Sequence, residues 1–116
     1  MSLQIPKQIP EKGFYYHYKH DPTKDINNYA YEIIGIGFHS EEDHKEGEAH
    51  FVIYLPLYEA YPYKASKELS IPCFDARPLE MFLGNVDKDG ETVPRFKKIT
   101  DQEIITKLKE IKSKMY

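Results

Sequence analysis

The stretch Arg77-Pro78-Leu79-Glu80-Met81-Phe82, followed by Asp89-Gly90 and then by Val93-Pro94-Arg95-Phe96, carries the clearest structural signals in the chain. The proline of the first stretch predicts a tight turn or a single turn of helix. We expect Leu79, Met81 and Phe82, which follow it, to fill the interior of a small barrel. Asp89-Gly90 predicts a hairpin whose return strand covers residues 93–98. This part of the chain therefore indicates a mainly β fold.

Three earlier segments have the alternation of side chains that is typical of strands, namely 14–19, 29–38 and 49–58. Gly35 and Gly37 in the second segment favour a β-bulge or a close approach of another backbone. The proline near the end of the third segment predicts an edge strand or a bend, because proline cannot donate to a ladder.

Two proline-containing stretches lie outside the expected strands. Residues 1–12 contain Pro6 and Pro10 and show no sustained period, so we expect an extended arm that leads into the first strand. Residues 59–72 hold further prolines and a short polar middle. This pattern predicts an inserted loop before a strand at 73–77.

The last segment changes to a helical period. Thr100 and Glu103 form a capping-box pattern, and apolar residues then recur at helical spacing. The sequence therefore predicts an amphipathic α-helix over 100–116. We expect its apolar stripe to pack on the barrel, and docking to a partner helix is the alternative.

The composition describes an ordinary globular chain of one domain. It has 116 residues, of which 41% are hydrophobic and 30% charged, and a formal net charge of -3. This slightly acidic balance argues against nucleic acid as a partner. No segment approaches the roughly 20 apolar residues of a membrane span, so we expect no membrane partner. Cys73 is the only cysteine, which excludes an internal disulfide and favours a reducing, cytoplasmic location.

Tyrosine dominates the aromatic residues, with ten tyrosines and six phenylalanines against no tryptophan. The simplest interpretation is β-structure, because tyrosine suits half-buried strands that keep its hydroxyl in water. The functional alternative is an aromatic binding face, because tyrosine offers rigid contact area with a polar tip. The composition alone leaves both interpretations open.

Several separated motifs, in order, resemble one known family. They are Tyr16-His17-Tyr18-Lys19, residues 31–37, His39-Ser40-Glu41, Tyr54, Leu57-Tyr58, Arg77-Pro78-Leu79, Met81-Phe82 and Val93-Pro94-Arg95-Phe96. The family is domain-of-unknown-function family 1653. The resemblance implies a small SH3-like β-barrel of about five strands over 13–99, a fold found in bacterial and phage proteins, between the arm at 1–12 and the helix at 100–116. It implies no established activity.

Two positions depart from the family pattern. His20 stands where the family usually has a glycine after the lysine, and it begins an added loop. Asp75 stands where the family has a tryptophan two residues before the arginine. If that tryptophan lines a ligand surface in the family, this chain selects a different ligand.

Polar and aromatic residues at motif positions near strand ends are the candidate ligand-binding residues. They are Tyr15, His17, His39, Ser40, Glu41, Tyr58, Arg77 and Arg95. Together they predict a non-catalytic binding or accessory module with a shallow aromatic and cationic groove. Its partner would be a peptide, a protein or a small anionic ligand that resembles a nucleotide.

Three other interpretations compete with the binding module. A small enzyme would use His17 or His39 as a general base and Arg77 to hold an anionic group, although no catalytic residues can be assigned. A weaker alternative is single-stranded nucleic-acid binding by tyrosine stacking. In a purely structural role, His39 and the serine after it would close a turn, while Arg77 would pair with Glu41 or Glu80.

The remaining reactive side chains do not predict a metal or cofactor site. His39, His44 and His50 lie close together in sequence, but their spacing matches no compact zinc signature. Cys73 stands between a proline and a phenylalanine, which is typical of a small buried apolar group. We therefore expect no metal and no cofactor, and the sequence leaves the oligomeric state open.

Overall fold

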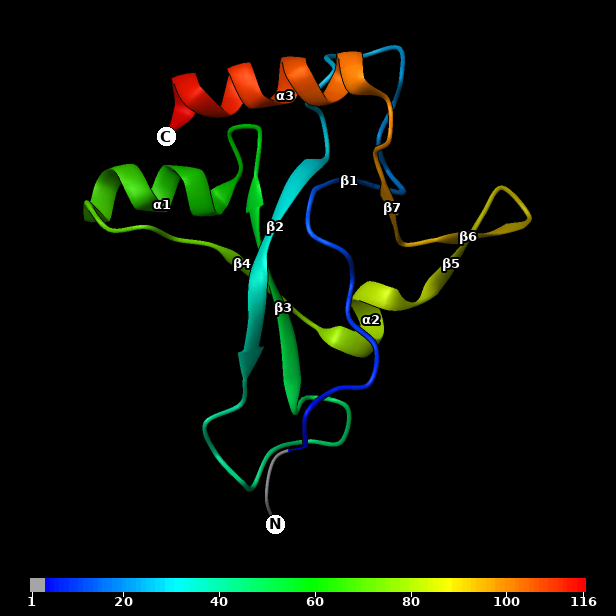
Figure 1. Ribbon diagram of the computed structural model, residues 1–116, viewed down its shortest axis with the longest axis vertical. Coiled ribbons are helices and arrows are strands. Elements are labelled where there is room, and N and C mark those ends of the chain that lie inside the picture. Colours follow the sequence, from blue (N-terminus) through cyan, green and yellow to red (C-terminus); the bar gives the residue numbers. More distant parts are fainter. Residues whose placement is uncertain (1–3) are drawn as a thin grey trace.

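The computed structural model describes residues 4–116, which form two antiparallel β-sheets and three helices (Figure 1). In chain order the elements are β1 (Phe14–His17), β2 (Ala30–Phe38), β3 (His50–Pro56), α1 (Tyr61–Leu69), β4 (Asp75–Pro78), α2 (Leu79–Leu83), β5 (Asn85–Lys88), β6 (Glu91–Pro94), β7 (Phe96–Lys98) and α3 (Gln102–Met115). The chain is thus mainly β with a C-terminal helix, as the sequence predicts.

The larger sheet has five strands in the order β4-β3-β2-β1-β7, and β5 pairs only with β6 in a separate hairpin. Within residues 4–116 the two edge strands, β4 and β7, do not pair with each other, so the sheet is open. The prediction of a closed barrel is therefore wrong. Three strands separate β4 from β7, and both edge strands are too short to extend a ladder across that distance.

The two faces of this sheet carry separate hydrophobic clusters. On one side, which we call the tyrosine face, the buried residues are Tyr15, Tyr31, Ile33, Val52, Tyr54, Leu79, Phe82 and Phe96. On the other side, which we call the helix face, they are Phe14, Ala30, Leu57, Ile99 and Leu108. Figure 1 shows α2 beside the middle of the sheet and α3 across one end of it, with α1 near α3.

The predicted apolar residues after Pro78 form the short helix α2, and two of the three are buried. Leu79 and Phe82 pack into the cluster of the tyrosine face, because residues three apart share one side of a helical turn. Met81 is 45% exposed, so the prediction that it fills the core is wrong. One turn of helix cannot direct all three side chains to the same side.

The hairpin predicted at Asp89-Gly90 is confirmed as the turn between β5 and β6. Both turn residues have positive φ, 52° at Asp89 and 81° at Gly90, as a two-residue turn of this kind requires. The predicted return strand divides into β6 and β7 around Arg95. The backbone of Arg95 is nevertheless paired on both sides. Its N–H donates to the Gly84 carbonyl at 3.0 Å, next to the Asn85–Pro94 pair, and its carbonyl accepts the Tyr18 N–H at 2.9 Å.

Strand β2 contains the expected bulge, whereas the prediction that β3 is an edge strand is wrong. The register between β2 and β3 shifts between Ile33 and Gly35, which confirms the irregularity that the glycines predict. β3 lies inside the sheet, between β2 and β4. Pro56 is tolerated there because it is the last residue of the strand.

The expected inserted loop at 59–72 instead contains helix α1. Pro62 lies in the first turn, where a backbone N–H has no intrahelical acceptor, so it starts the helix and does not break it. Ser70 ends the helix in a left-handed conformation, with φ of 55°. The prolines therefore mark the ends of a helix.

Helix α3 begins one residue later than the capping-box pattern predicts. The carboxylate of Asp101 accepts from the backbone N–H of Glu103 at 2.9 Å, so Asp101 and not Thr100 is the N-cap. The fully buried Leu108 packs the apolar stripe on the helix face, as expected. No helix within residues 4–116 is long and apolar enough to cross a membrane.

Candidate functional site

Five of the predicted site residues lie on the tyrosine face, and all of them except Tyr15 gather in one group. Strand pairing explains part of this arrangement, because β4 places Arg77 opposite Val52 and Asp75 opposite Tyr54, and paired residues share a face. We call this group the aromatic-arginine cluster. Its members are His17, Tyr29, Tyr31, Tyr54, Tyr58, Asp75, Arg77, Arg95 and Phe96.

A hydroxyl contact and a ring contact connect three tyrosines of the cluster. Tyr31 and Tyr58 are hydrogen-bonded through their hydroxyls, and the ring of Tyr31 meets the ring of Tyr54 edge to face at 5.1 Å. Burial raises the pKa of all three tyrosines above their usual value. Their hydroxyls therefore stay protonated at neutral pH and can donate hydrogen bonds.

The two arginines of the cluster differ in the hydrogen-bond partners of their Nε atoms. Arg77 donates from Nε to the Tyr54 hydroxyl at 3.1 Å, and its guanidinium lies 5.5 Å from the centre of the Phe96 ring. The buried Nε of Arg95 has no hydrogen-bond acceptor among residues 4–116. A buried donor without an acceptor costs about 1–3 kcal/mol, so Arg95 is the side chain that most needs a partner.

His17 is buried in the cluster, where it is only 8% exposed. Burial, together with the positive charges of Arg77, Lys19 and Arg95, lowers the pKa of His17 to about 4. Its ring is therefore neutral at pH 7. Nδ1 accepts the backbone N–H of Lys19 at 3.2 Å, so the proton of the neutral ring lies on Nε2. In this form Nε2 is a donor and not a general base.

Asp75 is the acidic residue of the cluster. Burial raises the pKa of its carboxyl above the usual value, and the nearby Arg77 opposes that shift. The negative charge of Asp75 also raises the pKa of Tyr31, Tyr54 and Tyr58. Asp75 therefore lies among the tyrosines and influences the pKa of each of their hydroxyls.

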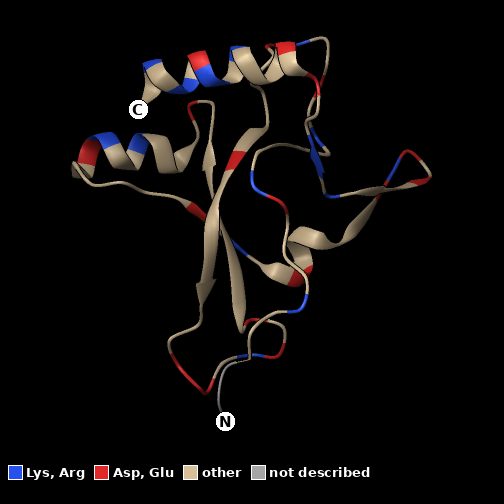
Figure 2. Ribbon diagram, viewed as in Figure 1, with Lys and Arg blue, Asp and Glu red and all other residues tan. Residues whose placement is uncertain are grey.

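The other predicted site residues are not members of this cluster, although Tyr15 lies on the same face, where its ring meets that of Phe82 edge to face at 5.7 Å. Tyr15 is buried, and its hydroxyl donates to the Glu11 carbonyl at 2.7 Å. His39, Ser40 and Glu41 follow the far end of β2, in the acidic loop at the bottom of Figure 2. His39 Nδ1 accepts the Glu41 backbone N–H at 3.0 Å. His39 therefore closes a turn, as expected if its role is purely structural. His39 and Glu41 therefore contact each other in this loop, while Arg77 donates to Tyr54 in the cluster.

Sequence reasoning missed several members of the cluster. It did not propose Tyr29, Tyr31, Tyr54 or Phe96 as site residues, although all four contribute rings to the cluster. The alternation of β3 was the available signal, because it places Tyr54 and Val52 on one face. What the alternation cannot give is the strand that supplies the arginine opposite them.

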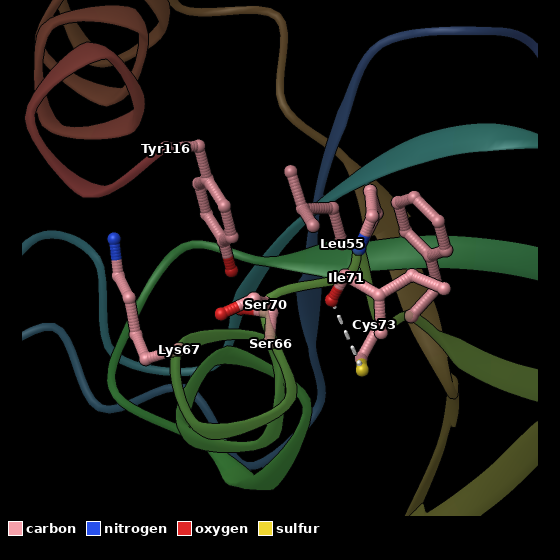
Figure 3. A pocket seen from close by; sticks show the side chains of 9 residues that line it. Leu55, Ser66, Lys67, Ser70, Ile71, Cys73 and Tyr116 are labelled. Atoms are coloured by element: carbon pink, nitrogen blue, oxygen red, sulfur yellow. Dashed lines mark hydrogen bonds between the residues drawn. The ribbon is translucent and has the colours of Figure 1, made fainter.

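A cavity of about 440 Å³ lies on the other side of the molecule, between α1, the segment after it and the end of α3 (Figure 3). Its walls are mainly apolar, from Leu55, Ile71 and Phe74. The Tyr116 hydroxyl, also at this cavity, donates to the Pro56 carbonyl at 2.7 Å. Lys67 is the charged residue among those that line it, and its ammonium donates to the Met115 carbonyl at 2.9 Å.

The single cysteine and the histidines show no reactive arrangement. Cys73 lines the apolar cavity and is partly exposed, so its expected full burial is wrong, and its thiol donates to the Ile71 carbonyl at 3.5 Å. Within the part of the chain that the structure describes, no three His, Cys, Asp or Glu side chains gather as a group that could hold a metal ion.

The fold and the cluster define a small domain with an open antiparallel sheet, one face of which presents tyrosines and arginines together. A family profile described as "Protein of unknown function (DUF1653)" matches residues 13–98, from just before β1 to the end of β7. The chain therefore belongs to this family, which confirms the resemblance of its motifs. No curated protein and no solved structure gives a significant match. Helix α3 lies beyond the matched region.

Proposed function

We propose that the protein is a non-catalytic binding module and that the aromatic-arginine cluster holds an anionic group of its ligand. The observation that carries this proposal is the buried Nε of Arg95, which has no acceptor within residues 4–116. A carboxylate or phosphate oxygen is the natural partner of such a donor. Binding then satisfies a group that is costly to leave unpaired.

The electrostatic surroundings favour an anion over a cation. The formal net charge of the chain is -3, yet three cations surround His17, and their charges add to the lowering of its pKa that burial causes first. The neutral His17 ring and the protonated tyrosine hydroxyls add hydrogen-bond donors. The ligand therefore meets many donors and, among the members of the cluster, one carboxylate, that of Asp75.

The rings of the cluster favour a ligand whose anionic group is attached to an apolar or planar body. Tyr29 is 37% exposed and lies 5.6 Å from the His17 ring and 5.8 Å from the Tyr58 ring, measured between ring centres. Exposed tyrosine rings bind such bodies with little loss of conformational entropy. A peptide, a protein or a small anionic molecule all satisfy this description.

Two finer predictions remain separate from this proposal. A cytoplasmic location follows only from the single cysteine, and it is consistent with a small intracellular ligand. An SH3-like relationship follows only from the family resemblance. Binding at the cluster depends on neither, because fold-level analogy does not define a site.

The enzyme alternative is weaker for a specific reason. A general base at neutral pH needs a free lone pair and a pKa near 7, whereas His17 has a pKa of about 4 and uses Nδ1 to accept the Lys19 N–H. His39 lies in the acidic loop, away from Arg77. The described residues therefore offer an anion holder without a matched base.

The side-chain N–H signals of the arginines provide the test. We expect the Arg95 Nε–H resonance to shift saturably when benzoate or sulfate is titrated into the protein. Arg95→Gln should weaken benzoate binding at least tenfold, which corresponds to loss of a charge-assisted hydrogen bond. Lys107→Gln removes the same charge from the exposed side of α3 and should change nothing. An Arg95 signal that no anion moves would contradict the proposal.

A further inference from the structure

A second cavity lies at the β7 edge of the large sheet, and it shares only His17 with the aromatic-arginine cluster. Its volume is about 310 Å³, at the lower end of the range for small-molecule sites. β1 with the turn after it, the end of β5, and strands β6 and β7 supply its walls. The cavity therefore lies where the hairpin meets the first and last strands of the sheet.

The lysines that line this edge cavity are its charged side chains, and Asp101 and Asp21 act on the lining residues Tyr16 and His20 from outside it. Lys88 and Lys97 line it, and none of its lining residues that the structure describes is acidic. The acids of the neighbouring hairpin, Asp87, Asp89 and Glu91, are not among them. A carboxylate-free cavity with two lysines is unexpected in a chain of net charge -3, and it suits an anion.

The two lysines contact the cavity from different strands, Lys88 from β5 and Lys97 from β7. Lys88 donates from Nζ to the Tyr18 carbonyl at 2.8 Å, which fixes its ammonium across the cavity and leaves further N–H groups for a ligand. Lys97 lies on the edge strand β7 opposite Tyr16, so the two side chains are neighbours on one face. Two separated ammonium groups can contact different oxygens of one anion.

Aromatic rings form the remaining wall. Tyr16 and His20 are stacked, with ring centres 3.6 Å apart and an angle of 14° between the rings. The Tyr16 hydroxyl also donates to the Ile26 carbonyl at 2.5 Å, which fixes the stacked pair. Tyr18 adds a partly exposed ring from the turn after β1. Fixed rings of this kind provide a flat surface for a planar group.

We infer that the edge cavity binds a small phosphate monoester that carries a flat ring, with the phosphate at Lys88 and Lys97 and the ring against the tyrosines. Lysine is a strong point-charge donor to phosphate, and aromatic side chains stack on planar groups whatever their substituents. This goes beyond the proposed function, because it assigns a second site with its own ligand.

Phenyl phosphate, inorganic phosphate and benzoate are the probes. We titrate each into the whole chain and follow backbone amide resonances by NMR. Phenyl phosphate should shift the signals of Tyr18, Val93 and Lys97 saturably, inorganic phosphate should shift them more weakly, and benzoate should do so least. Lys97→Gln should weaken phenyl phosphate about tenfold, the loss expected for one charge-assisted contact.

Two further variants test whether the ring and the charge of phenyl phosphate are bound by the residues proposed. Tyr18→Leu should weaken phenyl phosphate and leave inorganic phosphate unchanged, because only the ring contact is lost. Lys98→Gln is the matched control: it removes the same charge one residue along β7, where Lys98 pairs with Glu11 at 3.0 Å and does not line the cavity. It should leave phenyl phosphate binding unchanged.

Three results would overturn the inference. One is the absence of any saturable shift with phenyl phosphate, and another is an equal loss in Lys97→Gln and Lys98→Gln, which would indicate a diffuse charge effect. The third is binding of a single-stranded oligonucleotide without binding of phenyl phosphate. Each is independent of the Arg95 titration with benzoate, so this site can fail while the aromatic-arginine cluster stands.

Discussion

The two faces of the five-stranded sheet bury different kinds of side chains. The helix face buries aliphatic and small side chains with one phenylalanine, and its central residues Leu57 and Leu108 have no exposed surface. The tyrosine face instead buries hydroxyls, a neutral histidine and an arginine donor without an acceptor. The helix face also buries a carboxylate oxygen of Glu32, but Lys112 of α3 forms an ion pair with it, whereas the buried Arg95 donor has no acceptor among residues 4–116. We infer that the helix face supplies stability and the tyrosine face supplies binding.

The largest expected effect comes from the helix face. Leu108→Ala should lower the free energy of unfolding by about 2–5 kcal/mol, because it leaves a cavity among fully buried side chains. Benzoate affinity of the folded variant should not change. Urea denaturation measures the stability, and Leu69→Ala, at a leucine that is 64% exposed on α1, is the control with an expected change below about 0.5 kcal/mol.

If Leu108→Ala lowers the free energy of unfolding by less than about 1 kcal/mol, the helix face is not tightly packed, which would contradict the difference drawn between the two faces. Loss of benzoate binding in the folded variant would also contradict it. The two faces would then act as one unit.

The second effect is a pH dependence that belongs to the tyrosine face. The pKa of His17 is about 4 in the folded chain, against an ordinary value of 6.5. Below pH 6.5 the unfolded chain binds a proton that the folded chain does not, so stability falls as pH decreases from 6.5 towards 4. The loss should amount to about 3 kcal/mol in total.

His17→Gln should remove this contribution, so the variant should lose less stability than the wild type between these pH values. Thermal unfolding followed across that window gives the comparison, and the slope matters more than the stability at any one pH. Equal slopes in the two proteins would show that His17 is not held neutral by its surroundings.

A smaller effect concerns the cap of α3. Asp101→Ala should cost about 1 kcal/mol, because two backbone N–H groups at the start of the helix lose their acceptor. Thr100→Ala, one residue earlier, should cost less than half of that. Chemical denaturation of both variants decides between Asp101 and the capping-box residue, and a larger loss in Thr100→Ala would contradict the assigned cap.

The sequence predicts much of the fold because its local signals are unambiguous. Asp89-Gly90 demands a turn with positive φ, and the alternation of β3 separates Val52 and Tyr54 from their neighbours. The error at α1 has a local cause too, since a proline such as Pro62 either ends a helix or begins one. Only the residues after it, which favour a helix, distinguish the two cases.

The candidate site is less predictable because it depends on long-range pairing. Arg77 meets Tyr54 only through the register of β4 against β3, and that register is not encoded in either segment alone. Arg95 lies between β6 and β7, within what the sequence predicts as one strand, and that pattern does not show that its buried Nε has no acceptor among the described residues. His39, Ser40 and Glu41 were proposed from their motif, which gives no distance to the arginine.

The measurement that tests the central claim most directly is the paired stability and affinity of Arg95→Met. Methionine keeps most of the apolar volume and removes the buried donor, so the free energy of unfolding should stay unchanged or rise by up to about 1 kcal/mol. Benzoate binding should be lost at the same time. A variant that is clearly less stable, or one that binds benzoate as tightly as the wild type, would contradict the claim that the tyrosine face keeps an unsatisfied donor for a ligand.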